Sequence, residues 1–287
     1  MKPRIRKLLY ILMVGLFLFS TTKVVIQWLA EEEANESYAK AEALATSSTV
    51  AATTEPTAEV TEPAVTETTA PTETTAPTEP EIIWVPAPVE EYDTYIEQLN
   101  GIDLNALRKV NPDVVGWIRI PYTHVNYPLM QGEDNTYYLE HTWDDIESPY
   151  GSIFLESRNN PDMTDFNTII YGHNMNNGSM FGDLPSFGYQ WFANWNKYVY
   201  ILTDAGVYRY DVFSSYSAEV DSATYGLSFH QLQTRQDFIA LALENSKIET
   251  GIVPDPTDRI ITLSTCTGLG YESRHVVHAR LKMIPSE

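Results

Sequence analysis

The sequence predicts a mainly β domain, a barrel of short strands with helices around it, preceded by segments outside the barrel. Runs of β-branched and apolar residues separated by turn residues recur from residue 114 to residue 281. Two short helical patterns precede these runs, and another interrupts them before the last two strands. Many short strands with few helices favour a closed β-barrel, although their spacing alone is also compatible with a β-sandwich.

Residues 1–30 are predicted to be a basic cytoplasmic tail and a transmembrane anchor. Four basic residues lie before a largely apolar run from Leu8 to Ala30, interrupted by Lys23. At about 1.5 Å per residue, a helix of these 23 residues can cross a hydrocarbon core of roughly 30 Å. The positive-inside rule predicts a cytoplasmic N-terminus and an extracellular remainder. A cleaved signal peptide with its apolar core at Leu8–Ser20 is the alternative, but no convincing cleavage site follows that core.

Residues 31–81 are predicted to be a disordered tether. The segment is rich in Thr, Glu, Pro and Ala, carries the near-repeat TTAPTE, and has no aromatic residue after Tyr38. Such a composition cannot bury enough surface to offset the chain entropy lost on folding. Proline and like charges keep it extended, so we expect a spacer between the membrane and the folded domain.

Residues 82–287 are predicted to be the folded domain, and they are acidic. They hold 27 acidic and 12 basic residues, hence a net charge of −15, which argues against a nucleic-acid partner. Cys266 is the only cysteine, so the exported chain forms no internal disulfide. Composition leaves open whether this thiol is buried and inert or reactive.

The element boundaries follow from periodicity and turn residues. Helices are expected over 90–110, with a break at Gly101 and Asp103 as the cap of the second helix, and over 234–246, opened by a capping box at Thr234. Strands are expected at 114–120, 125–129, 151–155, 168–171, 198–203, 207–216, 260–265 and 274–281.

Three side chains are candidates for chemistry at the ends of predicted strands. Cys266 ends the strand 260–265, and Arg274 opens the next strand after a glycine turn. A thiol with a reference pKa near 8.5 needs neighbours that favour the thiolate and exchange protons. His173, in a loop after the strand 168–171, can exchange protons, and Arg274 can stabilise a thiolate or an oxyanion. A surface salt bridge from Arg274 to Glu272 is the structural alternative.

The other histidines and the acidic residues indicate no further site. His278 lies inside a strand and is expected in the core or at its rim. Surface positions are expected for His124, His141, His230 and His275. Asp144, Asp145 and Glu147 lack the ligand spacing of a calcium loop and are expected to form a solvated acidic turn. We therefore predict no metal site and no cofactor.

Several motifs together resemble those of sortases. TLSTC at residues 262–266, followed by Arg274, resembles the sortase active-site motif, and YGHNM at residues 171–175 resembles the catalytic-histidine loop. NPDVVGWIRIP, DNTYYLEH, GSIFLESRN, IIYGHNM with GSMFGDL, and RIITLSTC are similar to class B blocks, in the same order. The resemblance covers residues 90–287. It implies a closed sortase-type β-barrel with N-terminal helices and an extra helix before the cysteine strand.

The resemblance also implies a reaction and the residues that perform it. Cys266 is then the nucleophile toward a threonyl carbonyl in the C-terminal sorting motif of an exported protein. His173 is the general acid and then the base, and Arg274 holds substrate and oxyanion. The acyl group passes from a thioester to an amine of a cell-wall precursor, which anchors the protein to the wall.

A peptide groove is implied beside these three residues. Its lining residues would be Asn135, Leu139, Tyr171, Tyr225 and Ser264, with core packing as the alternative for Leu139 and Tyr171. Residue 267 is often acidic in class B relatives and is Thr267 here, so a carboxylate role at that position is not transferred.

Three alternatives remain beside a wall-anchoring class B sortase. A pilin-polymerising sortase would use a pilin lysine as its acceptor, and a hydrolytic cysteine protease would use water. A non-catalytic adhesion module presented on the Thr/Pro/Glu stalk would not need Cys266 at all.

Overall fold

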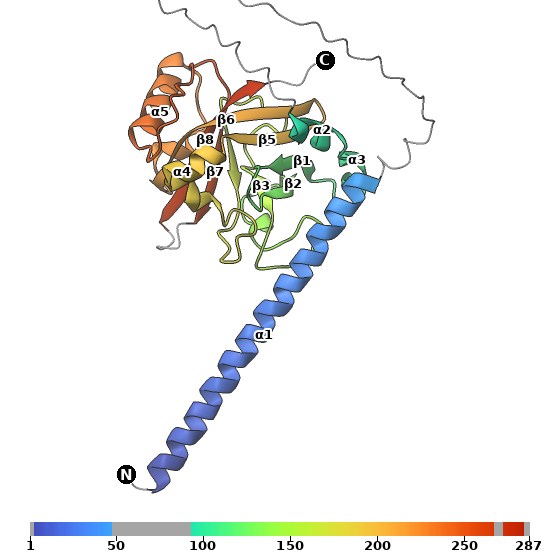
Figure 1. Ribbon diagram of the computed structural model, residues 1–287, viewed down its shortest axis with the longest axis vertical. Helices are drawn as coiled ribbons and strands as arrows, with labels where there is room; N and C mark the ends of the chain where they lie inside the picture. Colours follow the sequence, from blue (N-terminus) through green and yellow to red (C-terminus); the bar gives the residue numbers. More distant parts are fainter. Residues whose placement is uncertain (1–2, 48–92, 267–271, 284–287) are drawn as a thin grey trace, which may run out of the picture.

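The computed structural model describes residues 3–47, 93–266 and 272–283 (Figure 1). Within them, eight strands form a closed barrel in the order β1-β2-β3-β4-β7-β8-β6-β5. The strands are β1 (Val114–Arg119), β2 (Asn126–Met130), β3 (Ile153–Leu155), β4 (Asn167–Tyr171), β5 (Tyr198–Thr203), β6 (Gly206–Glu219), β7 (Ile260–Cys266) and β8 (Ser273–Met283). The predicted barrel is confirmed over the sandwich, and closure pairs each of these strands on both sides.

Strand direction decides which residues meet at each end of the barrel. β2 runs parallel to β3 and β4 runs parallel to β7, whereas the other described pairs are antiparallel. Parallel neighbours finish on the same side of a sheet, so the C-terminal ends of β4 and β7 lie together. β8 returns antiparallel to β7, which brings its N-terminal end to the same place.

Apolar side chains fill the barrel interior and hold its wall in place. Ile118, Leu129, Ile170, Leu263 and Val277 are fully buried members of one cluster. Each fully buried large aliphatic side chain contributes roughly 1.5–3 kcal/mol, so this cluster is a major source of stability. The strand ends are therefore supported by a close-packed core.

Short helices surround the barrel, and those at residues 94–100, 104–108 and 232–244 lie near the positions that the sequence predicts. They are α2 (Thr94–Asn100), α3 (Leu104–Arg108), α4 (Gln190–Trp195), α5 (Leu232–Glu244) and the 3-10 helices η2 (Tyr137–Leu139), η3 (Leu184–Gly188) and η4 (Ala223–Tyr225). The Asp103 carboxylate caps α3 by accepting from the Ala106 amide at 3.0 Å, as expected.

The predicted start of the helix before the cysteine strand is wrong by two residues. α5 begins at Leu232, and the Thr234 hydroxyl donates to the Gln231 carbonyl at 2.7 Å instead of forming a capping box. Phe238 of this helix packs edge-on against Phe166, which holds α5 on the outside of the barrel.

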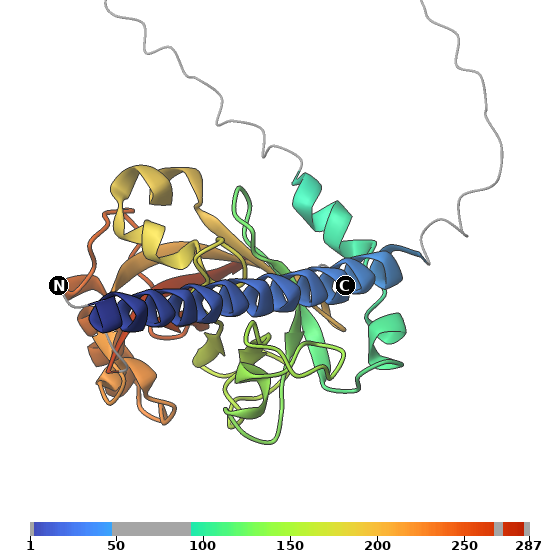
Figure 2. The same ribbon diagram turned by 90° about the horizontal axis from the view of Figure 1, so that it is seen from below.

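The N-terminal helix α1 (Pro3–Ser47) is one continuous element of 45 residues. Residues 31–47 were expected in the disordered tether, and the structure corrects that boundary because they are helical. The rest of the predicted tether lies outside the described residues. Figure 1 shows the N-terminal half of α1 projecting away from the barrel and its C-terminal end lying beside the barrel, and Figure 2 shows the whole helix from below.

The C-terminal half of α1 is docked on the barrel through a stripe of small side chains. The buried members of the stripe are Ala34, Ser37, Ala41 and Ala45, which recur at helical spacing. The Trp143 indole donates to the Ser37 carbonyl at 2.9 Å, and the Lys40 ammonium lies 2.8 Å from the Asp144 carboxylate. Small side chains let the helix approach the barrel closely. Because these side chains are only mildly hydrophobic, their pattern in the sequence did not predict that they are buried.

Candidate active site

The ends of β4 and β7 bring His173 and Cys266 to the same level of the barrel. Tyr171 on β4 pairs with Ser264 on β7, and the two candidates each lie two residues beyond that pair. The Gly172 amide donates to the Ser264 carbonyl at 3.2 Å, and the Thr265 hydroxyl donates to the Gly172 carbonyl at 2.7 Å. These bonds extend the ladder past β4, so the start of the histidine loop is fixed against the cysteine strand.

Arg274 stands directly opposite Cys266 in the antiparallel ladder of β7 and β8. Side chains of directly opposed residues project to the same face, about 4.5–5.5 Å apart at their Cβ atoms. The Arg274 guanidinium also donates to the Ser273 carbonyl at 3.2 Å. The Cys266 side chain and the predicted glycine turn with Thr267 lie outside the described residues. The ladder therefore places Arg274 and Cys266 at directly opposed positions of β8 and β7.

The His173 ring is oriented by the backbone of the short helix η2. Its Nε2 atom lies 2.7 Å from the Leu139 carbonyl oxygen. A carbonyl only accepts, so Nε2 carries the proton of this bond and Nδ1 is the nitrogen left for proton exchange. Leu139 is 37% exposed, which argues against the core-packing alternative for that residue.

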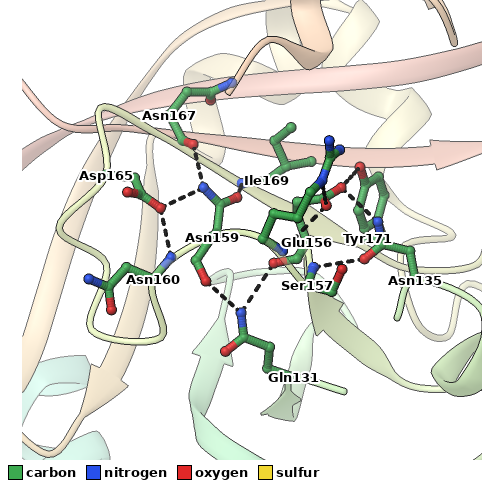
Figure 3. Close-up of polar contacts among 11 residues, drawn as sticks. Gln131, Asn135, Glu156, Ser157, Asn159, Asn160, Asp165, Asn167, Ile169 and Tyr171 are labelled. Carbon is green, nitrogen blue, oxygen red and sulfur yellow. Dashed lines mark hydrogen bonds and ion pairs between the residues drawn. The ribbon is translucent and has the colours of Figure 1, made fainter. Parts of the chain in front are cut away.

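A buried carboxylate, Glu156, joins two of the predicted groove residues (Figure 3). Its Oε2 atom accepts from Asn135 Nδ2 at 2.7 Å and from the Tyr171 hydroxyl at 3.0 Å. Its Oε1 atom accepts from Arg158 Nε at 2.7 Å. Burial alone would raise the pKa of Glu156, but the hydrogen bonds from Arg158, Tyr171 and Asn135 outweigh it and hold that pKa below its usual range.

Glu156 is a residue that sequence reasoning missed. It is the first polar residue after the strand β3, and its side chain is only 2% exposed. A carboxylate buried to this extent needs hydrogen-bond donors, and here the donors come from separate elements. The carboxylate in turn raises the pKa of Tyr171, after burial of the phenol, which raises it most.

The remaining groove candidates are linked on the other side of β4. The Tyr225 hydroxyl, from η4, lies 2.8 Å from the Ser264 hydroxyl. Ser264 is buried, whereas Tyr225 is half-buried. A row across β4 and β7 is thus formed by Asn135, Tyr171, Ser264 and Tyr225. Leu139 is joined to the end of β4 through its hydrogen bond with His173.

The structure corrects the expected position of His275 and decides that of His278. His275 was expected at the surface but is buried, with Nε2 2.9 Å from the Ser215 hydroxyl, because its strand β8 packs between two others. His278 is fully buried. Burial lowers the pKa of His278 to about 3, and burial with the Lys247 charge lowers that of His275 to about 4. Neither ring can serve as a proton donor near neutral pH.

The acidic turn at residues 144–147 was expected to be solvated throughout, but one of its side chains binds the helix α1. Asp144 was expected to be solvated, but its side chain is 2% exposed and binds Lys40 of α1. Asp145 and Glu147 are exposed. Among the described residues, no group of three or more His, Cys, Asp or Glu side chains is arranged to hold a metal ion.

Comparison with known proteins finds the same architecture in relatives. Residues 118–282 match the family described as the sortase domain. The chain is similar to sortase B of Listeria monocytogenes, with 35% identity over 181 residues, 62% of this chain and 74% of that protein. It is also similar to sortase B of Staphylococcus aureus, with 34% identity over 178 residues, 61% of this chain and 73% of that protein. Among solved structures, a Staphylococcus aureus sortase B–substrate complex has a TM-score of 0.60 and 32% identity, covering 63% of this chain and 85% of that chain. The family match therefore runs from β1 to β8.

Proposed function

The chain belongs to the sortase family, class B, and we propose that it cleaves a sorting motif of exported proteins at a threonyl bond through a Cys266 thioester. Enzymes of this family are cysteine transpeptidases, so the acyl group passes to an amine. The observation that carries the proposal is the register of β4, β7 and β8. It brings His173, Cys266 and Arg274 to one end of the barrel.

The first half-reaction would form the thioester and release an amine. The Cys266 thiolate attacks the threonyl carbonyl, and the Arg274 guanidinium stabilises the oxyanion that forms. When the C–N bond breaks, the His173 imidazolium gives its Nδ1 proton to the leaving amine. The ring keeps its Nε2 proton on the Leu139 carbonyl, so it ends neutral and correctly oriented.

The second half-reaction would reverse these roles. An incoming primary amine attacks the thioester carbonyl, and His173 Nδ1 accepts its proton. The C–S bond then breaks and the Cys266 thiolate leaves, which returns the enzyme to its starting state. A hydrolytic protease would use water at this step, so the choice of nucleophile separates the two activities.

The row of Asn135, Tyr171, Ser264 and Tyr225, with Leu139, would line the groove for the sorting motif. The support is their shared location beside His173 and the hydrogen bonds that fix their orientation. The buried Glu156 carboxylate would act as a positioning group for Asn135 and Tyr171.

The membrane-anchored topology is supported by α1, whose N-terminal half is exposed, apolar and long enough to cross a membrane. Its basic start would remain in the cytoplasm and the barrel would lie outside the cell. The substrates would then be exported proteins that carry C-terminal sorting motifs, and the acceptor an amine of a cell-wall precursor. The docked half of α1 would hold the barrel close to the bilayer.

The deciding experiment traps the thioester. Purified full-length chain is mixed with a panel of candidate sorting peptides, and mass spectrometry follows acylation of Cys266, with Cys266→Ala as control. Added triglycine should convert the thioester to an amide product. Release of free acid that triglycine does not alter would contradict transpeptidation and favour a protease. Absence of acylation with every peptide, together with surface adhesion that Cys266→Ala leaves intact, would favour the adhesion module, which the family match already disfavours.

A pilin-polymerising role is separated by its acceptor. A lysine-bearing pilin peptide that outcompetes triglycine for the thioester would favour polymerisation over wall anchoring.

A further inference from the structure

Three large aromatic side chains form an exposed patch at the helix α4. Trp191 and Trp195 lie at positions i and i+4 on one face of this helix and are 63% and 70% exposed. Tyr122, from the turn between β1 and β2, is 73% exposed and meets Trp195 edge-on, with ring centroids 6.4 Å apart. Single exposed apolar side chains are common, but a contiguous group of this size marks an interaction surface. We refer to Tyr122, Trp191 and Trp195 as the aromatic patch.

The aromatic patch stands on well-packed backbone. Phe192 of α4 packs edge-on against Phe187, with ring centroids 5.0 Å apart, and Ala193 is buried. Tyr122 has a φ of 57°, a left-handed conformation that bulky residues seldom adopt. The fold therefore directs these rings outward even where a smaller residue would be less strained.

The aromatic patch lies at the same end of the barrel as His173. Arg119, the last residue of β1, pairs with Tyr200 near the start of β5, so the turn after β1 and the helix α4 before β5 meet at this end. The pairings of β1 with β2, β2 with β3 and β3 with β4 bring the C-terminal end of β4 there too. His173 follows β4, so it shares this end with the patch.

A short loop links this end of the barrel to α1. Asn177 Nδ2 donates to Glu31 Oε1 of α1 at 2.9 Å. The next residue, Gly178, packs so closely on His124 that a Cβ atom there would lie 2.9 Å from the imidazole Nδ1. His124 belongs to the same turn as Tyr122. The loop therefore contacts α1 on one side and the turn of the aromatic patch on the other.

Glu31 marks the boundary of the apolar half of α1. Leu29 is 54% exposed just before it, whereas Ala34 is 2% exposed in the docked half. In the proposed topology, the helix leaves the hydrocarbon core near this boundary and enters the polar interface. Figures 1 and 2 both show α4, drawn in yellow, toward the same side of the barrel as the N-terminal end of α1. The aromatic patch is therefore on the side that faces the proposed membrane.

The charge around the aromatic patch suits an anionic membrane surface. Residues 82–287 carry a net charge of −15, yet residues 184–198 include no Asp or Glu and one basic residue, Lys197. Asp183, directly before this segment, lies 2.8 Å from His124 Nδ1 through its Oδ2 atom. An acidic domain that anionic lipids would otherwise repel can approach them through this surface.

We propose that the aromatic patch lies in the headgroup interface of the membrane that α1 crosses. Tryptophan and tyrosine suit this position because the rings are apolar while the indole N–H and the phenol O–H keep polar partners. The patch is a second contact with the bilayer beside α1, and it holds the His173 end of the barrel toward the lipid surface. The inference rests on the proposed membrane anchoring and adds a contact that the proposed reaction does not require.

The test measures quenching of tryptophan fluorescence by brominated lipids. Full-length chain is reconstituted in phosphatidylglycerol vesicles whose acyl chains carry bromine near the headgroup, and unbrominated vesicles give the reference emission. The variants are Trp28→Phe, in the apolar half of α1, and the double variant Trp191→Gln/Trp195→Gln. These are the three exposed tryptophans of the described residues, so the double variant should lose about two thirds of the wild-type quenching. Its urea midpoint of unfolding should match wild type, because both side chains are exposed.

A tryptophan at the other end of the barrel is the matched control. Ala205→Trp, added to the double variant, lies in the exposed turn after β5, at the end where β1 begins, and it should restore no quenching. Quenching that Trp191→Gln/Trp195→Gln leaves unchanged while Trp28 is quenched would overturn the proposal. Equal quenching of the tryptophan at position 205 would do the same. A shift of the Trp191 and Trp195 emission with soluble cell-wall glycan, and none with lipid, would assign the patch to glycan instead. Absence of quenching at Trp28 would overturn the anchoring and the patch contact together.

Discussion

His278 and His173 differ in their tautomer and in their burial. Thr262 donates to Asn167 Oδ1 at 2.6 Å, so its hydroxyl oxygen accepts from His278 Nδ1, 2.9 Å away. His278 Nε2 then accepts from the Tyr216 hydroxyl at 3.1 Å. The buried ring is thereby fixed neutral with its proton on Nδ1, whereas His173 carries its neutral-state proton on Nε2.

Location, not residue type, decides the state of a histidine in this fold. Both nitrogens of His278 are bonded inside the barrel wall beneath α5, where Phe238 covers the ring edge-on. His173 lies half-exposed past the end of β4, where a substrate can reach it. The first ring is part of the buried barrel wall, and the second is the ring to which the proposed function assigns proton transfer.

The largest expected effect comes from His173→Gln. A glutamine amide can still donate to the Leu139 carbonyl, but it cannot transfer a proton. We expect transpeptidation to fall by about 10²–10⁴-fold while the urea midpoint of unfolding stays unchanged. His124→Gln, at an exposed position, is the control and should keep activity. A large loss of stability in His173→Gln would make its role structural, like that of His278.

The opposite result is expected at the buried ring. His278→Ala creates a cavity and leaves the hydroxyls of Thr262 and Tyr216 without the ring, so we expect a loss of about 3 kcal/mol in unfolding free energy. Tyr216→Phe is the milder variant, with a loss of about 1 kcal/mol. Activity per folded molecule should remain. If the stable variant Tyr216→Phe lost activity, the buried ring of His278 would also be needed for catalysis, and its role would not be structural alone.

The same contrast predicts how stability depends on pH. The pKa values of His275 and His278 are lowered to about 4 and about 3, against about 6.5 in the unfolded chain. The unfolded state therefore takes up protons first as pH falls below 6.5. Stability should decline by at most about 1.4 kcal/mol per pH unit for each histidine until the folded pKa is reached.

Urea unfolding between pH 6.5 and pH 5 measures this contribution, because the carboxylates with lowered pKa values, such as Glu156, lose their stabilisation only at lower pH, and the raised pKa of Asp211 acts in the opposite sense. His278→Gln should lose about half of the slope. An unchanged slope in that variant would show that the ring already binds a proton in the native barrel.

Much of the barrel could be predicted from the sequence because its signals are local. The strand before Cys266 and the Asp103 cap depend on residues close together in the chain, and both were placed correctly. The register of β4 with β7 could not be derived from spacing, since it joins segments about ninety residues apart. The resemblance to sortases supplied only the expectation that the barrel brings His173, Cys266 and Arg274 together.

Three of the failures share one physical cause, a partner distant in sequence. Ala34 and Ala41 read as tether because alanine is only mildly apolar, and their burial depends on a barrel surface about one hundred residues away. Asp144 read as solvated because its partners, Ser37 and Lys40, belong to α1. Glu156 escaped notice because its donors converge only in the folded state.

A small expected effect on activity concerns Glu156, a buried carboxylate that accepts hydrogen bonds from the proposed groove residues Asn135 and Tyr171. Glu156→Gln keeps the shape but turns an amide N–H₂ toward groups that themselves donate. We expect a loss of about 1–2 kcal/mol in stability and a roughly threefold higher KM for the sorting peptide. Arg158→Ala is the matched comparison, since the Arg158 side chain is 71% exposed and its ion pair should contribute less than about 1 kcal/mol. If Arg158→Ala raised the KM as much as Glu156→Gln, the groove would depend on the surface charge and not on the buried bonds to Asn135 and Tyr171.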